Sequence, residues 1–524
     1  MKFFTVVTTL SLPLALAAPR FQHKQSNFTV GQVVETSSGF IAGHAAAIDC
    51  EVSEYLGIPF AQPPVGGLRF AAPLKYTGTS RLNASTFGNS CPLRPSSGTT
   101  PTPGEIAASN ITEVGLELLT TIGSPDVVHG EDCLYLNIWS KPQSGEPLKA
   151  VMVFIYGGGF TGGTSATPIF NGAALAGQED VVIVNFNYRL SILGWPGNPT
   201  AQNNVALLDQ RLAMEWVRDN IANFGGDPTR ITLFGQSAGA ASTDFYSYAW
   251  SPDPIAAGII LESGTTGLYP ANSENVSATA WYSTSMALGC GDASTNSTTL
   301  LECMRNVEVD SLLSAIPQTA LSAIMSPFGP TVDNTLIFSN YSQQTPASIP
   351  VLAGNNDYES GLFRTQLALS GEILPDSLWD AYDLAGFTCP AGSRANASLI
   401  AKNPTWRYRY FGVFPNINIS SEGGAWHGAE LQLLFGTTYL TGNNTVEETA
   451  FQKYLQGAWT TFAKDPANGL RTYEEGWPLY NPAEKTLIRL GYGNGVGTNL
   501  ASPMLYDSAC ANASLSALIA SYFG

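Results

Sequence analysis

One serine of this chain has neighbours that suit a nucleophile. Ser237 stands in Gly235-Gln236-Ser237-Ala238-Gly239, after the apolar run 231–234 and before a predicted helix over 238–248. A serine on a sharp turn between a strand and a helix projects its hydroxyl above the sheet, and the flanking glycines let the backbone pack closely. Because a chain with 52 glycines can also contain this pattern by chance, the interpretation depends on whether the partners of a nucleophile are present.

The first partner is a general base, since serine is a poor nucleophile at its free pKa. The four histidines are His23, His44, His129 and His427. When the nucleophile sits on such a turn in an α/β sheet, the chain order is serine, acid, histidine. This order selects His427.

The second partner is a carboxylate that orients the base. Asp357 and Glu359 both follow the predicted strand 349–353, where a side chain overhangs the sheet edge. Position alone leaves both open as the acid, with an ordinary solvated loop carboxylate as the alternative.

The third requirement is a set of donors for an oxyanion. Gly157-Gly158-Gly159 follows the predicted strand 151–156, and bare glycine backbone can aim N–H groups at one point. We expect Gly158 and Gly159 to form this oxyanion hole together with the amide of Ala238. The same glycines also fit a dinucleotide-binding loop ending at Gly162, but residues 164–168 are a poor helix start, which disfavours that alternative.

Strand-like and helix-like runs alternate around these residues. Apolar runs at 151–156, 181–186, 258–261 and 349–353 predict buried strands, and residues 203–223 have the periodicity of a helix. This order predicts an α/β fold with a mostly parallel central sheet flanked by helices. In such a fold we expect the functional site at the carboxyl ends of the strands.

The N-terminus predicts export. Residues 1–17 combine Lys2, an apolar stretch and Ala15-Leu16-Ala17, which is typical of a signal peptide, and they leave 18–524 as a single catalytic domain. No later run is apolar enough for a transmembrane segment, so we expect a secreted, extracellular protein. Acceptor sites for N-glycosylation agree with export and lie at Asn27, Asn83, Asn110, Asn275, Asn296, Asn340, Asn396, Asn418, Asn443 and Asn512.

The charge balance argues against some partners. Lys and Arg total 24 against 41 Asp and Glu, a formal net charge of −17. A surface of this sign does not favour nucleic acid, and the serine chemistry requires neither a metal nor an organic cofactor.

Several motifs together resemble the type-B carboxylesterase and lipase family, whose members have the α/β-hydrolase fold. The motifs are the nucleophile pentapeptide, the triple glycine, Tyr55 to Pro64, Glu131 to Asn137, Asn187-Tyr188-Arg189 and Asn220 to Pro228. The resemblance implies that Glu359 is the acid, although Ser360 is an extra residue before the glycine that usually follows. It also implies ion pairs Arg69–Glu131 and Arg189–Asp209.

The resemblance further implies disulfides Cys91–Cys133, Cys290–Cys303 and Cys389–Cys510. Cys50 is then the odd cysteine, and we expect it to be a buried small side chain. The loop of about residues 91–133 corresponds to a lid in related yeast lipases. Its residues Ile111, Val114, Leu118, Leu119 and Ile122 give it one apolar helical face, which could meet a lipid interface.

Two departures from the family bear on the substrate. Many members have glutamate where this chain has Gln236, and residues 92–132 contain no Phe, Trp or Tyr to hold a choline by cation–π contact. The sequence therefore predicts a serine hydrolase for esters with apolar acyl chains. The alternatives are a carboxylesterase for small soluble or aromatic esters without interfacial activation, and a binding or adhesion homologue that has lost catalysis.

Overall fold

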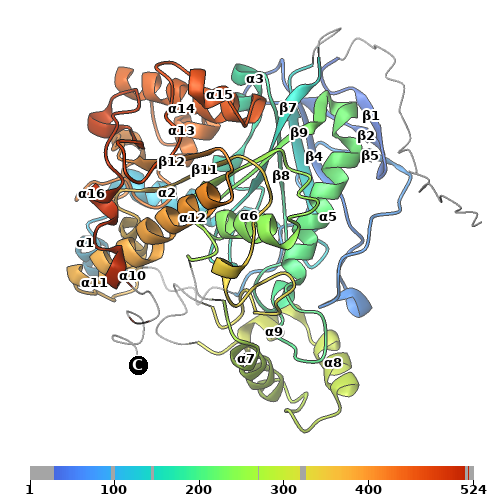
Figure 1. Ribbon diagram of the computed structural model, residues 1–524. Coiled ribbons are helices and arrows are strands. Elements are labelled where there is room, and N and C mark those ends of the chain that lie inside the picture. The colour runs from blue at the N-terminus through green and yellow to red at the C-terminus, as the bar shows by residue number, and fades with distance from the viewer. Residues whose placement is uncertain are drawn as a thin grey trace, which may run out of the picture.

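The computed structural model describes residues 29–95, 101–124, 126–142, 147–268, 271–318, 326–513 and 517. The expected signal peptide and Asn27 lie outside these residues. A ten-stranded sheet runs through the molecule in the order β13-β12-β11-β10-β9-β7-β8-β6-β4-β3 (Figure 1). Its strands are β3 His44–Ala45, β4 Ser53–Pro59, β6 Tyr135–Ser140, β7 Lys149–Ile155, β8 Val182–Phe186, β9 Gly226–Gln236, β10 Gly258–Glu262, β11 Val351–Asn356, β12 Thr405–Tyr410 and β13 Leu487–Leu490.

The sheet is parallel from β8 to β13, whereas β3, β4 and β6 pair in antiparallel fashion at one end. Every residue of β7, β8, β10 and β11 is buried, as the continuous apolar runs predict for strands covered on both faces. A separate small sheet consists of β1 Val33–Thr36, β2 Gly39–Ala42 and β5 Arg81–Asn83.

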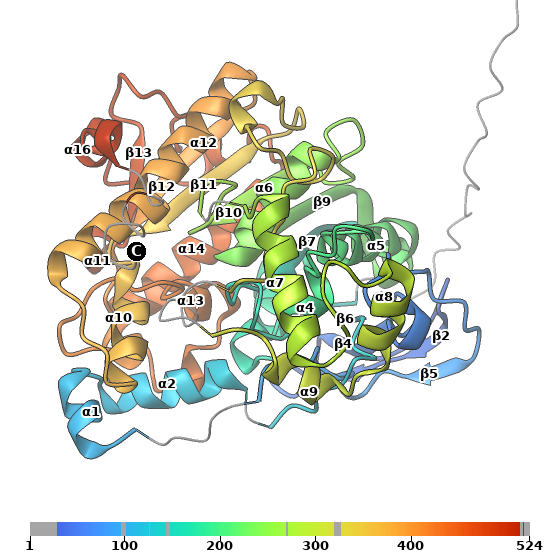
Figure 2. The same cartoon turned by 90° about the horizontal axis from the view of Figure 1, so that it is seen from below.

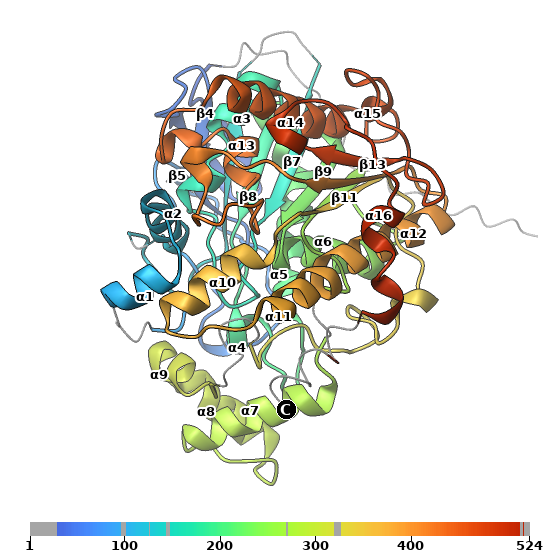
Figure 3. The ribbon, with the colours of Figure 1, turned by 90° about the vertical axis from the view of Figure 1, so that its left-hand side faces the viewer.

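Helices cover both faces of the large sheet, which confirms the predicted fold class. On one face lie α5 Val205–Asn220, α6 Ala238–Ala249 and α12 Cys389–Ile400, and on the other lie α3 Ala173–Glu179, α13 Leu431–Phe435, α14 Val446–Lys464 and α15 Gly469–Thr472 (Figures 1 and 3). The predicted helix 203–223 ends as α5 at Asn220 and continues as a 3-10 turn to Phe224, because Gly225 adopts a left-handed φ of 85°.

Two groups of helices extend from the sheet. Helices α7 Glu274–Ala287, α8 Ser297–Asn306 and α9 Val309–Ser314 project from one end and enclose their own apolar cluster (Figures 1 and 2). A second group adjoins the carboxyl ends of the strands and consists of α1 Pro103–Ala108, α2 Glu113–Gly123, α10 Ser360–Leu369 and α11 Asp376–Tyr382. Two short helices complete the set, α4 Ser191–Gly194 and α16 Met504–Asp507.

The cysteines pair as expected, with one correction. Disulfides join Cys91 to Cys133, Cys290 to Cys303 and Cys389 to Cys510, with Cα atoms 5.0, 5.6 and 5.4 Å apart. The prediction of a buried Cys50 is wrong, because its side chain is exposed. Cys50 lies in the tight turn between β3 and β4, which Val52 closes by donating its N–H to the carbonyl of Asp49.

The expected glycosylation acceptors differ in exposure. Asn418 is half-buried and the others that can be judged are exposed, namely Asn83, Asn110, Asn275, Asn296, Asn340, Asn396 and Asn443. Among the described residues, no helix combines the length and apolar character that crossing a membrane requires.

Candidate active site

Ser237 lies on the sharp turn that its glycines predict. It separates β9 from α6 and has φ 58° and ψ −125°, a backbone conformation that residues other than glycine rarely adopt. A Cβ on Gly239 would approach the carbonyl oxygen of Ile155 to 1.9 Å, so only glycine lets this turn pack against β7. The Ser237 N–H donates to the carbonyl of Glu262 over 2.8 Å, which ties the turn to β10.

Glu359 and His427 come together although 68 positions separate them. Nδ1 of His427 lies 2.6 Å from Oε2 of Glu359, in a hydrogen bond to which the ring contributes the proton. The other carboxylate oxygen, Oε1, accepts the N–H of Asn356 over 2.6 Å. Both side chains are buried, so this hydrogen bond is shielded from water.

The remaining candidates for base and acid lie elsewhere. Asp357 forms an ion pair with Arg409 over 2.7 Å, whereas His427 pairs with Glu359. His44 lies 3.5 Å from Glu54, and Nδ1 of His129 is 2.9 Å from the carbonyl of Cys91. His23 lies outside the described residues.

A cavity of about 280 Å³ opens over Ser237 and His427. Nε2 of His427 has no hydrogen-bond partner among the described residues. The rings of Phe363 and Phe387 each lie 5.0 Å from the imidazole and stack on one another over 6.4 Å, so the three rings form one cluster. The cavity wall is mainly apolar and includes Ile122, Ile169, Phe170, Leu362, Trp426 and Leu431.

The glycine loop after β7 lines the same cavity. Gly158 and Gly159 have φ of 115° and 60°, and a Cβ on Gly158 would approach the carbonyl oxygen of Gly162 to 2.3 Å. Ala238 is the first residue of α6, whose N-terminal amides lack partners within the helix and attract negative charge. No helix begins at Gly162, so the loop lacks the element that a dinucleotide site requires.

Two further carboxyls lie buried behind the acid. Burial raises the pKa of Glu430 to about 8, opposed by a hydrogen bond from Asn356 and reinforced by the charge of Glu359. Burial also raises the pKa of Glu262 well above its usual range, and Glu430 adds to this effect. Burial therefore favours the protonated form of both carboxyls.

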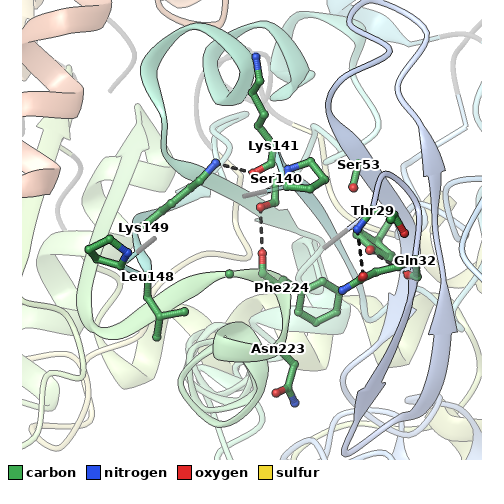
Figure 4. A pocket seen from close by; sticks show the side chains of 13 residues that line it. Thr29, Gln32, Ser53, Ser140, Lys141, Leu148, Lys149, Asn223 and Phe224 are labelled. Atoms are coloured by element: carbon green, nitrogen blue, oxygen red, sulfur yellow. Dashed lines mark hydrogen bonds between the residues drawn. The ribbon is translucent and has the colours of Figure 1, made fainter. Parts of the chain in front are cut away.

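A second, smaller cavity lies at the opposite edge of the sheet. It has about 40 Å³, and its lining includes Ser140 at the end of β6, Lys149 at the start of β7 and Phe224 shortly before β9 (Figure 4). Its polar groups bond to one another, as when Ser140 donates to the carbonyl of Phe224 over 2.8 Å and Lys149 to that of Lys141 (Figure 4). It lacks the pairing of nucleophile and base found at the larger cavity.

Sequence reasoning missed the residues that support the imidazole. Phe363 and Phe387 had no signal in the sequence, because aromatic residues are common in cores and the contacts join distant segments. Glu430 is visible in the sequence three residues after His427, but its burial next to Asn356 depends on distant contacts. The expected ion pairs are present, with 2.6 Å contacts joining Arg69 to Glu131 and Arg189 to Asp209.

Comparisons with known proteins agree with this geometry. The model of the Carboxylesterase family matches residues 30–377 and 370–505. Chlorogenic acid esterase of Aspergillus niger is 35% identical over 479 residues, 88% of each chain. Secreted lipase 5 of Gibberella zeae is 32% identical over 542 residues, 96% of this chain and 98% of the lipase. Cholinesterase of Mus musculus is 29% identical over 541 residues, 89% and 84% of the two chains. With this family match and a serine turn facing a histidine–glutamate pair, the chain belongs to the carboxylesterase family and is a carboxylic ester hydrolase.

Proposed function

We propose that this protein is a secreted serine hydrolase that cleaves esters with apolar acyl chains through an acyl-enzyme. The observation that carries the proposal is the 2.6 Å hydrogen bond between Glu359 and His427, beside a cavity that Ser237 also lines. Secretion is supported by the disulfides and by the name of the secreted lipase relative. The signal peptide 1–17 and a single catalytic domain over 18–524 are parts of the proposal.

The proposed reaction has two halves. Ser237 Oγ attacks the ester carbonyl while Nε2 of His427 takes its proton, and Glu359 stabilises the imidazolium. The amides of Gly158, Gly159 and Ala238 bind the oxyanion that forms. His427 then protonates the leaving alcohol, and water releases the acyl group by the same route.

The substrate class follows from the cavity wall. Apolar side chains dominate it, and Gln236 places a neutral amide beside the serine. Nε2 of Gln236 is buried without a partner among the described residues, so this position offers a hydrogen-bond donor and no negative charge to attract a cation. We therefore propose neutral, apolar esters as substrates.

Helix α2 is the proposed lid. Leu118 on its apolar face is buried, and Ile122 lines the cavity over the serine. Opening α2 would expose these side chains, at roughly 1.5 to 3 kcal/mol for each large aliphatic, and a lipid surface would offset that free energy.

A second candidate is a carboxylesterase for soluble esters, in which α2 stays docked. The contacts at both ends of α2 favour it. Thr112 donates its N–H to the carbonyl of Ile419 over 3.0 Å, and Ser124 Oγ donates to Thr167 Oγ1 over 2.9 Å. A relative named for chlorogenic acid, 35% identical, agrees with this candidate.

The test combines one variant with one substrate series. Ser237→Ala should lower kcat by at least about 10³-fold while the fold remains intact. Ser242→Ala is the matched control, because it removes a buried hydroxyl from α6, the helix that follows Ser237, and should retain activity within a few-fold. Retained turnover in Ser237→Ala would refute the assignment of the nucleophile.

Rates on esters from short to long acyl chains, measured below and above their solubility limits, separate the two candidates. A jump in rate at the solubility limit supports the lid. A smooth rise supports a docked α2 and an esterase for soluble substrates.

A further inference from the structure

A π-helical turn lies beside the proposed acid and base. Helices α11 and α12 are joined by the π-helical segment Asp383–Thr388, which Tyr382 precedes and Cys389 follows. Such turns are rare in proteins and are frequent at functional sites. Two side chains of this segment, those of Asp383 and Phe387, contact the neighbourhood of Glu359 and His427.

The carboxyl of Asp383 binds the residue next to the acid. Ser360 donates its backbone N–H to Oδ1 of Asp383 over 2.6 Å, and its Oγ lies 2.8 Å from Oδ2. Ser360 is the first residue of α10 and follows Glu359 directly. Through these two bonds Asp383 holds the backbone from which the Glu359 side chain extends.

Phe387 contacts His427, the other partner in the hydrogen bond between Glu359 and His427. Its ring lies 5.0 Å from the imidazole of His427 and packs against Tyr382, which in turn contacts Phe363 of α10. The π-helical segment therefore contacts the acid through Ser360 and the base through Phe387. A shift of this segment would move both partners.

We propose that Asp383 is a positioning residue, which fixes Ser360 and thereby holds the carboxylate of Glu359 against His427. This role rests on the proposed function of Glu359 and His427. It also accounts for Ser360, the extra residue between the acid and the glycine at 361. The backbone N–H and the hydroxyl of Ser360 both contact the carboxyl of Asp383.

The charges around Asp383 come from two other elements. Glu359 and Tyr358 lie on the acid loop, and Arg409 of β12 lies nearby but is paired with Asp357. Burial raises the pKa of Asp383 to about 8, the bonds from Ser360 oppose this, and the charge of Glu359 reinforces it. At neutral pH Asp383 is therefore uncharged, so it adds no second charge beside Glu359, and asparagine is its close mimic.

The test compares Asp383→Ala with Asp383→Asn. The asparagine retains a carbonyl for the Ser360 N–H and an amide that can donate to the Ser360 hydroxyl. Asp383→Ala should lower kcat by about 10- to 100-fold with KM within about twofold, since displacement of a catalytic group by about 1 Å has an effect of this size. Asp383→Asn should retain kcat within about threefold. Asp376→Ala is the control, because the ion pair of this exposed carboxylate of α11 among the described residues is with Arg364.

A second readout does not depend on turnover. The Nδ1 proton of His427, in a short bond to a carboxylate, gives a far-downfield proton resonance that can be assigned by its loss in His427→Ala. This resonance should weaken or shift in Asp383→Ala and remain in Asp383→Asn and Asp376→Ala. Melting temperatures measured alongside report whether each variant is folded.

Two results would overturn the positioning role. One is an unchanged resonance and kcat in a folded Asp383→Ala. The other is an Asp383→Asn variant as impaired as the alanine variant. Failure of the proposed function would look different, because Ser237→Ala would then retain turnover whatever the resonance does.

Discussion

Glu359 and Asp357 are two residues apart, yet their carboxylates bind different partners. The Glu359 carboxylate is buried against His427, whereas Asp357 is partly exposed and pairs with Arg409 of β12. The same side-chain chemistry thus serves two purposes. The partner that each carboxylate meets decides which one can orient a base.

This difference leads to a prediction for the pair. Glu359→Gln should lower kcat by about 10³- to 10⁴-fold, because the amide no longer stabilises the imidazolium or holds its tautomer. Asp357→Asn should lower kcat by less than about tenfold, since it weakens only an ion pair beside the site. Steady-state kinetics on a soluble ester measure both, with melting temperatures as the check on folding. A larger loss in Asp357→Asn than in Glu359→Gln would reverse the assignment.

At the scale of single residues, the sequence predicts those site residues that belong to a short local motif. Ser237, Gly158 and Gly159 were predicted because glycines beside a strand end leave a short, recognisable pattern. Asp383 and Phe387 were not, because their contacts depend on how a distant helix packs. The exposed Cys50 was mispredicted for a related reason, since burial in a turn depends on neighbours that the sequence does not reveal.

Among the elements, α2 is held at its N-terminus by several contacts with a distant segment of the chain. Thr112 caps its N-terminus by accepting the N–H of Gly115 over 2.8 Å, and Ile111 forms a bridge with Ser420. A Cβ on Gly115 would approach the carbonyl oxygen of Ile419 to 2.3 Å. The helix therefore lies against the loop that leads to His427.

We predict that Gly115→Ala lowers the melting temperature. Alanine favours a helix over glycine by about 1 kcal/mol, but the clash is with backbone, and overpacking of this kind costs about 1–3 kcal/mol. Gly123→Ala is the matched control on the same helix, because a Cβ there meets no atom within 4 Å. It should leave the melting temperature unchanged or raise it. Equal effects of the two substitutions in a thermal melt would show that α2 is not tightly docked.

The amphipathic pattern predicted that α2 exists and which face is apolar, but not what that face meets. Its partners are distant in sequence, by 43 residues in the bond from Ser124 to Thr167 and by 306 in the bond from Thr112 to the carbonyl of Asn418. Whether such a helix is a lid or a wall depends on the strength of those distant contacts.

For the whole molecule, buried acids make stability depend on pH. The carboxyls of Glu430 and Asp383 have pKa values raised to about 8 from ordinary values of 4.5 and 3.8. Between these limits the folded state binds more protons than the unfolded state. The free energy of unfolding therefore falls as pH rises from about 4 to about 8, and it levels off outside that window.

We predict a melting temperature that is higher at pH 5 than at pH 8. Glu430→Gln should make this dependence shallower, because the glutamine cannot ionise when the chain unfolds. Glu302→Gln removes the same charge from an exposed position and should leave the slope unchanged. Thermal melts of the three proteins across pH 5–8 measure the slopes. Parallel curves for wild type and Glu430→Gln would contradict this origin of the pH dependence.

Much of the parallel half of the fold was predictable, and the rest was less so. Strands β7, β8, β10 and β11 are apolar runs and were predicted, whereas β12 and β13 of the same parallel part and the order of the strands within the sheet were not. The antiparallel strands β3, β4 and β6 and the small sheet have weaker patterns. Their pairing is set by contacts such as that between Leu136 and Phe186, which join distant segments.

The backbone of Ser237 has a consequence for how such proteins evolve. A non-glycine residue at φ 58° and ψ −125° costs of the order of 1–3 kcal/mol, and the surrounding strands must offset this strain. Glycine at the same position would relax the turn, so a descendant that lost the nucleophile would gain stability as it lost activity. An active enzyme of this shape must therefore retain a reserve of folding free energy, and engineering for heat resistance should add stability far from this turn.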